Sequence, residues 1–600
     1  MAHDQIHSMV MDYVTRDSIF DAVLGCQDNC IRVVSDSNLA MEVDTDSSVF
    51  TLKSLKGDES TKVKSHVTPM VFGSDKGSLT GLGIDGRENN TMWKINDTKN
   101  SVVSCLKVFD ITMDGSMEIV VGRDDGRLQV YSQDGSGGCP VLSFTRDLGE
   151  SIRALECGKV NSTDFNEIVV AGYSGKILSF TSEPTQDRAP DDSYGRTVQT
   201  VNNENRIKHL KKELDGLKQK VEKEKSKIQQ AKSKMGSNAS TIDTARAGNV
   251  DFPINSTFIL NVEKAAYALT IEIQSAIDLV IIRSPVHIEL IDADVGSAVV
   301  SITPESLICA DESKDGKPEY CFIATYRLQH QEKRLSVLVR TMEGEFGELQ
   351  ATVVSAQTPK AAKVIRYSLQ PLSLHTRVHA FEDEEDQRPR NSIKFVGSVS
   401  LAIFHEWVGA LLPGVPSRID ENSIGEEYYF QSVYSGAVTI CYMKKNELTF
   451  ESESVSTIAI IKENILRYAI HRRIELSDTT SCNPDTIGSF LSLIREKLEY
   501  QLSLTRKMEL IDAIQEITLQ EPDTRWLSVE YAEILRDKEL IRKEFGNREK
   551  SLEVMSGVIT DLFVDWHKLR GVDAKAGIPA LTNAIRTVFF EELVQMILNY

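Results

Sequence analysis

A repeat in the first third of the chain restricts the fold more than any other feature. Each repeat holds an apolar stretch that ends at a small residue, a polar turn and a second apolar stretch. The first stretches are residues 22–25, 70–73, 119–122 and 168–171, and the second are 31–34, 79–82, 128–131 and 177–180. The turns close at Asn29, Gly77, Gly126 and Gly175, which lie 48, 49 and 49 positions apart. Glycine and asparagine adopt the positive backbone angles of tight hairpin turns.

A period near 50 residues, with two hairpin strands and room for two more, is typical of propeller blades. We therefore predict an incomplete β-propeller of about four blades over residues 1–185. A propeller that does not close exposes strand edges, which need a partner or further sequence to cover them.

The next segment indicates a partner helix. Residues 186–204 carry few apolar side chains and are predicted to be a linker, and residues 205–235 then show apolar residues at alternating steps of three and four. Lysine and glutamate fill the positions between them, as in a two-stranded coiled coil. A solvated single helix is the alternative, but so narrow a seam is stabilised mainly by a second helix. The predicted partner-binding seam is Ile207, Leu210, Leu214, Leu217, Val221 and Ile228.

Three further regions are predicted downstream of a second linker, residues 236–250. Short alternating β runs divided by turns predict an antiparallel sandwich over 251–358. Mixed strands and helices, the latter at 403–412 and 456–471, predict an α/β platform over 359–475. Helical spacing from 476 to 600 predicts an α-helical C-terminal region, with a long first helix and later helices at 528–545, 548–569 and 581–598.

Composition restricts the partners. A formal net charge of −20 disfavours nucleic acid as the main partner. No basic and apolar leader begins the chain, and no apolar stretch is long enough to span a membrane, so we expect a soluble protein. Nine scattered cysteines suit a reducing compartment. Cys26 and Cys30 form one close pair, but without a second pair or a nearby histidine we interpret them as buried strand cysteines rather than zinc ligands.

The catalytic motifs each fail on a specific residue. Gly81–Gly86 matches a dinucleotide fingerprint, but no helix follows it. Residues 311–316 open like a calcium loop, yet Phe322 stands where the bidentate glutamate is needed. His375 and His379 have the spacing of a zinc helix, but Thr376 replaces the general base. Residues 110–115 resemble an acidic cation-binding turn without a full set of ligands. We predict no enzyme, no cofactor and no metal.

Several stretches together resemble the Bardet-Biedl syndrome protein 7 family, whose members are subunits of the coat complex called the BBSome. The stretches that carry the resemblance are residues 118–126, 276–278, 297–301, 324–327, 371–375, 497–502 and 559–563. The resemblance implies a propeller, a coiled coil, an adaptin-ear-like sandwich, a platform and C-terminal helices. Family members carry a propeller of about seven blades, so we expect this chain to lack the N-terminal part.

The resemblance also implies a function and partners. We expect a structural coat subunit that acts in trafficking of membrane proteins to and from the cilium and in cilium assembly. Its partners would be the second and ninth Bardet-Biedl proteins, with indirect membrane association through an Arf-like GTPase and the assembled coat. The expected places are the cytoplasm, the ciliary basal body, the cilium and the ciliary membrane. The alternative is a cation- or ligand-binding propeller outside the BBSome that uses turns such as Asp110 to Asp114 and Asp124-Asp125.

Overall fold

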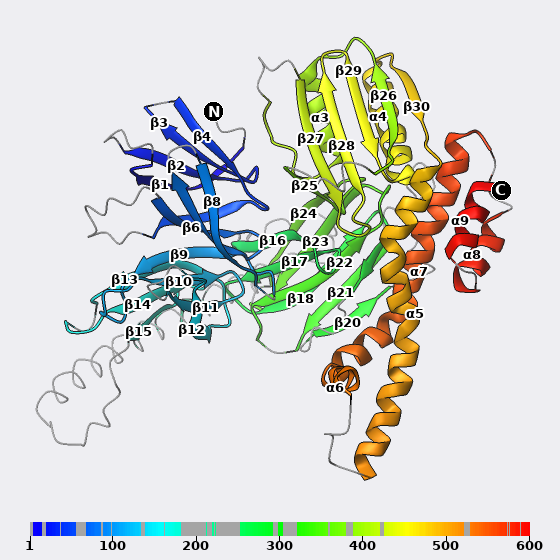
Figure 1. Cartoon of the computed structure of the whole chain (residues 1–600). Coiled ribbons are helices and arrows are strands. Elements are labelled where there is room, and N and C mark those ends of the chain that lie inside the picture. Colours follow the sequence, from blue (N-terminus) through cyan, green and yellow to red (C-terminus); the bar gives the residue numbers. More distant parts are fainter. Residues whose placement is uncertain are drawn as a thin grey trace, which may run out of the picture.

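In the computed structural model, the sandwich lies between the propeller strands on one side and the long C-terminal helices on the other, and the platform lies above it in this view (Figure 1). The structure describes residues 4–14, 20–36, 38–55, 68–85, 88–97, 99–133, 138–160, 163–181, 252–291, 298–303, 321–329, 331–357, 360–379, 388–419, 425–520, 528–572, 574, 577–587 and 590–599, with Lys212, Gly216, Gln219, Lys220 and Lys223.

Among these residues, the first fifteen strands form four antiparallel sheets. Three sheets have four strands and the last has three. The strands are β1 (Ile6–Asp12), β2 (Asp21–Cys26), β3 (Cys30–Ser35) and β4 (Asn38–Asp44); β5 (Val49–Ser54), β6 (Thr68–Ser74), β7 (Leu79–Asp85) and β8 (Glu88–Ile95); β9 (Val103–Phe109), β10 (Glu118–Arg123), β11 (Arg127–Ser132) and β12 (Val141–Asp147); and β13 (Ile152–Gly158), β14 (Glu167–Gly172) and β15 (Ile177–Thr181).

The repeated turns and small residues have distinct physical causes. Asn29, Gly77, Gly126 and Gly175 all have positive φ, as hairpin turns require. The small residues Gly25, Gly73 and Gly122, near the ends of β2, β6 and β10, instead leave room for the next blade. A Cβ atom on Gly73 would lie 2.3 Å from Val103 Cγ1. The first strands of successive blades contact one another, β1 with β5, β5 with β9 and β9 with β13.

The sandwich consists of two sheets that enclose one core. One sheet has the order β16 (Ile254–Asn261), β17 (Ala266–Ile273), β22 (Arg334–Thr341) and β19 (Ile288–Leu290). The other has the order β20 (Ala298–Ile302), β21 (Phe322–Leu328), β18 (Ile277–Ser284), β23 (Gly347–Ser355) and β24 (Ala362–Leu369). Alternate side chains such as Leu269 and Ile271 meet Val280 and Ile282 from the other sheet.

The predicted boundary at residue 358 falls inside the sandwich. β24 pairs with β23 from Gly347↔Leu369 to Val354↔Ala362, and its Ile365 and Tyr367 pack against the sandwich core. The chain between β23 and β24 is therefore a hairpin connection, although in the sequence it resembles a break between domains.

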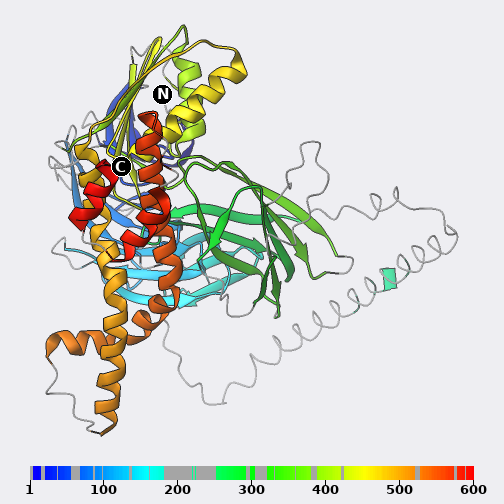
Figure 2. The same ribbon diagram turned by 90° about the vertical axis from the view of Figure 1, so that its right-hand side faces the viewer.

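The platform is a sheet with two helices on one face (Figure 2). Its strand order is β25 (His375–Val378), β27 (Gly425–Ser432), β28 (Val438–Lys444), β29 (Glu447–Ser452), β26 (Asn391–Val396) and β30 (Ser477–Ser481). Helices α3 (Leu401–Leu411) and α4 (Val455–Arg472) lie within a few residues of their predicted positions. Because β30 pairs with β26, the platform extends beyond the predicted end at residue 475.

Two long helices dominate the C-terminal region. They are α5 (Asp485–Gln520) and α7 (Lys538–Leu569), and the apolar residues Ile487, Leu491 and Ile494 of α5 pack with Ile559 and Phe563 of α7. The predicted break between residues 545 and 548 is wrong, because α7 continues through it and its packing on α5 outweighs the weak local signal of Gly546. The break instead follows α6 (Val529–Arg536), and residues 581–598 lie in two helices, α8 (Ile578–Thr587) and α9 (Phe590–Asn599). In the described part of the chain, no helix is long and apolar enough to cross a membrane.

Candidate interaction site

The predicted coiled-coil seam lies outside the described residues. This applies to all six positions, Ile207, Leu210, Leu214, Leu217, Val221 and Ile228. Five residues between them are described, and all five are helical and exposed: Lys212, Gly216, Gln219, Lys220 and Lys223. The seam therefore stays a prediction.

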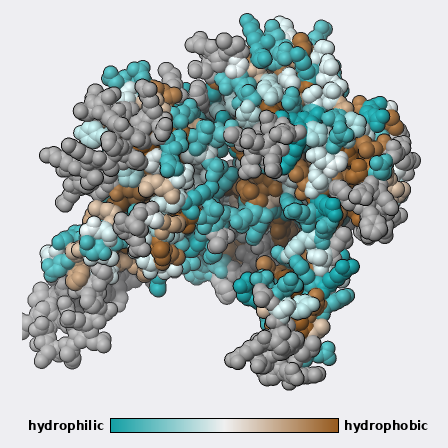
Figure 3. Space-filling model, in the orientation of Figure 1, coloured by the Kyte–Doolittle hydropathy of each residue, from teal (hydrophilic) through white to brown (hydrophobic). Residues whose placement is uncertain are grey.

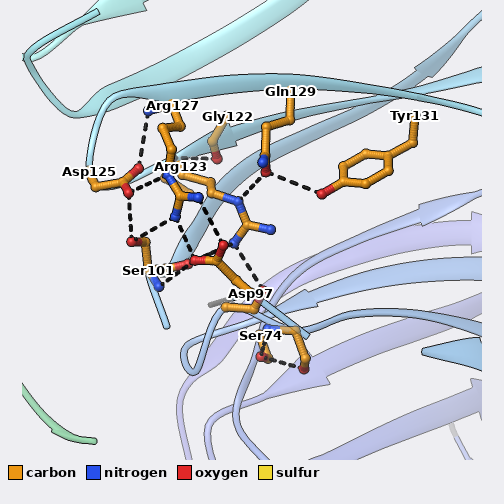
Figure 4. Close-up of polar contacts among 12 residues, drawn as sticks. Ser74, Asp97, Ser101, Gly122, Arg123, Asp125, Arg127, Gln129 and Tyr131 are labelled. Atoms are coloured by element: carbon orange, nitrogen blue, oxygen red, sulfur yellow. Dashed lines mark hydrogen bonds and ion pairs between the residues drawn. The ribbon is translucent and has the colours of Figure 1, made fainter. Parts of the chain in front are cut away.

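A buried arginine joins the second and third blades (Figure 4). Arg123 ends β10 and has no exposed surface. Its Nη1 donates to the backbone oxygens of Gly77 and Ser101, both at 2.9 Å, and its Nε donates to Gln129 Oε1. The side chain thus holds turns that are 46 and 22 residues away in the sequence.

Asp97 supplies the negative charge of this junction. Its two oxygens accept from Arg127 Nη1 at 2.9 Å and Nη2 at 2.6 Å, and Arg123 Nη1 lies 3.6 Å from Oδ2. Burial alone would raise the pKa of Asp97, but the hydrogen bonds from Arg127 and the charge of Arg123 outweigh it and lower the pKa. The carboxylate therefore stays ionised, and its negative charge lies beside the buried guanidinium of Arg123 and the partly buried one of Arg127. We call Asp97, Arg123 and Arg127 the arginine junction.

Two acidic residues beside the arginine junction are also paired with arginines. Asp125, from one of the acidic turns in the alternative interpretation, accepts from Arg127 Nε and from Ser101 Oγ at 2.8 Å. Asp124 lies 3.5 Å from Arg334 of the sandwich. Both carboxylates therefore already have cationic partners in the protein.

The other acidic turn brings three carboxylates together. Ligand oxygens of Asp110, Asp114 and Glu118 lie within 4.8 Å of one another. Each also accepts a hydrogen bond from a nearby backbone amide, at 2.9 Å from Gly115, 2.8 Å from Ser116 and 2.7 Å from Ile111. Among the described residues, Asp110 Oδ1 is buried and has no hydrogen-bond partner.

The propeller contacts the sandwich through a buried glutamate. Glu272 on β17 is 1% exposed and accepts from the Ser151 backbone amide at 2.9 Å and from the Ser151 hydroxyl. Asn255 Nδ2 donates to the same carboxylate at 3.0 Å. Because a buried carboxylate without such donors is costly, this contact fixes the fourth blade against the sandwich.

A cavity of about 520 Å³ lies between the propeller and the sandwich, with both charged and apolar residues in its lining. Propeller turns and the polar outer face of β16, β17 and β22 line it. Its lining includes both cations and anions, namely Lys76, Lys94, Lys99, Asp124 and Asp147. The cavity can therefore pair with ligand groups of either charge. Burial lowers the pKa of Lys76.

The propeller also contacts the platform, through β25 and the residue that follows it. Lys76 Nζ lies 3.4 Å from Thr376 Oγ1, and Arg377 Nη1 lies 3.5 Å from the Asp28 backbone oxygen. His379 Nδ1 lies 3.4 Å from Asp44 Oδ1 at the end of β4. His375 instead contacts Glu343 of the sandwich at 2.8 Å. His375 therefore begins a strand and His379 follows it, so the two histidines are not on a helix, and they contact different domains.

Exposed apolar side chains lie on the outer side of the propeller. Figure 3 shows apolar residues among polar ones over this part of the molecule. The edge strand β12 exposes Val141, Leu142 and Phe144, and β15 exposes Ile177. Open strand edges with apolar side chains are suited to contact with another chain.

Sequence reasoning missed the residues that join the domains. Glu272 lies 121 positions from Ser151, and His379 lies more than 300 positions from Asp44. No local motif marks such pairs. Arg123 carries one usable signal, because a charged residue directly follows the buried run Ile119–Gly122.

Four family models match the chain in succession. They describe a BBS7 beta-propeller over residues 1–182, a BBS7 GAE domain over 251–367, a BBS7 platform domain over 375–480 and a BBS7 hairpin over 484–597. The order agrees with the propeller, sandwich, platform and long helices of the structure.

Two relatives match nearly the whole chain. A mouse protein described as BBSome complex member BBS7 is 34% identical over 582 residues, which cover 97% of this chain and 78% of the relative. A Caenorhabditis elegans protein described as BBSome complex member bbs-7 is 25% identical, over 99% of this chain and 78% of the relative. The crystal structure of BBS1N in complex with ARL6DN matches with 14% identity over 30% of this chain and 52% of that one, at a TM-score of 0.23. A likeness that weak does not establish a shared fold.

Proposed function

Since the chain belongs to the BBS7 family, we propose that it is a structural subunit of the BBSome that acts in trafficking of membrane proteins to and from the cilium and in cilium assembly. One observation carries the proposal: 34% identity to BBSome complex member BBS7 extends over 97% of the chain. The proposal assigns it no catalysis and no small-molecule substrate.

The internal contacts support a scaffold role. Buried polar groups join successive parts: Arg123 and Asp97 within the propeller, Glu272 and Ser151 between propeller and sandwich, and the Tyr267 hydroxyl, which donates to the Ser373 oxygen at 2.6 Å, between sandwich and platform. Such contacts need one fixed geometry to be satisfied. A subunit held this way presents its exposed surfaces in a constant arrangement to its partners.

The proposed partners are other BBSome subunits, chiefly the second and ninth Bardet-Biedl proteins. The coiled-coil seam would pair with a helix of one of them, and the apolar edge strands β12 and β15 would offer a second surface. We propose peripheral membrane association, through the assembled coat and an Arf-like GTPase, at the cilium and its basal body.

The seam can be tested in the full chain expressed with an affinity tag in ciliated cells. Leu214→Asp with Leu217→Asp would bury two uncompensated charges in a helix pair, so the other subunits should be lost from the purified material. The measurement is mass spectrometry of the proteins that co-purify.

The matched control places the same residue type on the same helix at exposed positions. Lys212→Asp with Gln219→Asp should leave the recovered subunits unchanged, since both side chains are exposed and each lies two positions after a seam residue, away from the positions that flank the seam. Recovery of the partner at wild-type yield with the Leu214 and Leu217 variant would show that the seam assignment is wrong. Recovery of the unaltered chain alone, at monomer size, would contradict the scaffold function itself.

The alternative is a cation- or ligand-binding propeller outside the BBSome. The convergence of Asp110, Asp114 and Glu118 within 4.8 Å is the observation that favours it. Carboxylate oxygens suit Ca²⁺ or Mg²⁺. A stoichiometric calcium ion that Asp114→Ala removes, in a chain that recovers no other subunit, would support this alternative.

A further inference from the structure

Three metal-ligating side chains from two domains converge where the first blade meets the platform. Cys30 begins β3, Asp44 ends β4, and His379 directly follows β25. One ligand atom from each lies within 4.8 Å of the others. No histidine lies near Cys30 in the sequence, but folding brings His379 beside it.

The measured separations fit the edges of a coordination tetrahedron. Zinc bonds of about 2.3 Å to sulfur and about 2.0 Å to oxygen or nitrogen, at tetrahedral angles, place sulfur and oxygen about 3.5 Å apart, and oxygen and nitrogen about 3.3 Å apart. Cys30 Sγ lies 3.6 Å from Asp44 Oδ1, and His379 Nδ1 lies 3.4 Å from the same oxygen. The third separation, between Cys30 Sγ and His379, is within 4.8 Å, so two of the three edges match and the third is bounded.

The surrounding charges leave Asp44 available. Arg32 donates to both oxygens of Asp28, at 2.9 and 2.6 Å, and pairs with Glu42 at 2.6 Å, so these two nearby carboxylates already share a cationic partner. Within the described residues, Asp44 has no lysine or arginine partner. Its side chain is 62% exposed, which gives an ion and a water ligand access from solvent.

The imidazole of His379 faces the cluster through Nδ1, which lies 3.4 Å from Asp44 Oδ1. Its other nitrogen, Nε2, is buried and has no hydrogen-bond partner in the part of the chain that the structure describes. Nδ1 is therefore the nitrogen that would bind the ion.

We propose that Cys30, Asp44 and His379 bind a zinc ion that joins the propeller to the platform, with water or a further side chain as the fourth ligand. A thiolate and an imidazole beside one carboxylate favour zinc over calcium or magnesium, which take oxygen ligands. Binding would release the Cys30 thiol proton to solvent, and the ion would balance the thiolate charge. The role is structural and does not depend on the BBSome function.

Cobalt titration of the metal-free full chain provides the test. We expect one equivalent of Co²⁺ to give tetrahedral visible bands and a near-ultraviolet thiolate-to-cobalt charge-transfer band, both abolished by added zinc. Cys30→Ser should remove the charge-transfer band. His379→Gln should weaken binding by more than the about 10- to 100-fold that follows loss of an outer-shell partner.

Cys139→Ser is the matched control, because Cys139 is an exposed free thiol away from the cluster and its loss should leave the spectrum unchanged. His379→Gln also protects the test if Cys30→Ser fails to fold, since His379 is 16% exposed and outside the blade cores. Absence of a charge-transfer band in the wild-type chain, its persistence in Cys30→Ser, or unchanged affinity in His379→Gln would each overturn the proposal.

Discussion

Asp97→Ala tests whether the arginine junction holds the second and third blades together. The variant leaves the fully buried Arg123 without a carboxylate within 4 Å among the described residues. It also removes both hydrogen bonds that Asp97 accepts from Arg127. Breaking a buried pair in this way costs about 3–5 kcal/mol. The lower end applies here, because Arg127 keeps Asp125 at 2.5 Å and Arg123 keeps its carbonyl and Gln129 partners. We expect a loss of about 3 kcal/mol.

Hydrogen exchange followed by mass spectrometry measures this loss within one part of a multidomain chain. A loss of about 3 kcal/mol speeds exchange of amides that open with the blade by about 100-fold. The effect should be confined to β6–β11, while β26–β29 of the platform stay unchanged.

Asp46→Ala is the control for the arginine junction. Its partner Lys94 is 38% exposed and Asp46 itself is 81% exposed. Such a surface pair contributes about 0–1 kcal/mol. If Asp97→Ala changed exchange no more than Asp46→Ala does, the argument that the junction holds the blades would be refuted.

Two further predictions concern blade packing and pH. Gly122→Ala should destabilise the third blade by about 1–3 kcal/mol in the same exchange measurement, because the added Cβ would lie 2.7 Å from Ile152 Cγ2. Gly158→Ala meets nothing within 4 Å and should cost less than half as much. Burial raises the pKa of Asp565 on α7 from 3.8 to about 6, so ionisation of this carboxyl destabilises the folded helices by up to about 3 kcal/mol. The penalty is absent below about pH 4 and complete above about pH 6, so Asp565→Asn should flatten the pH dependence of urea unfolding across that range; an unchanged pH profile would contradict this assignment.

The hairpins of the propeller illustrate what could be predicted. Their turn residues have positive φ, and their strands either alternate or contain a short apolar run, and both signals lie within about 15 consecutive residues. The same holds for α3 and α4, whose apolar spacing and short loops predict them to within a few residues. Such elements follow from local dihedral preferences and local hydrophobic pattern.

Boundaries were less predictable because a turn inside a domain resembles a break between domains. β24 belongs to the sandwich only because Ile365 and Tyr367 reach its core. Likewise, α7 passes Gly546 without interruption because its contact with α5 continues. Both outcomes depend on burial against distant residues, which outweighs a local breaker worth about 1 kcal/mol.

The sequence by itself determined the order of the described parts: blades, sandwich, platform and helices. Only the tertiary structure decided which polar groups meet across them, including Arg123 with Asp97, Ser151 with Glu272, and Cys30 and Asp44 with His379. The physical reason is the distance along the sequence over which each effect acts. Turn chemistry and periodicity act between residues a few positions apart, whereas a buried charge is satisfied by whichever group the packed chain places beside it.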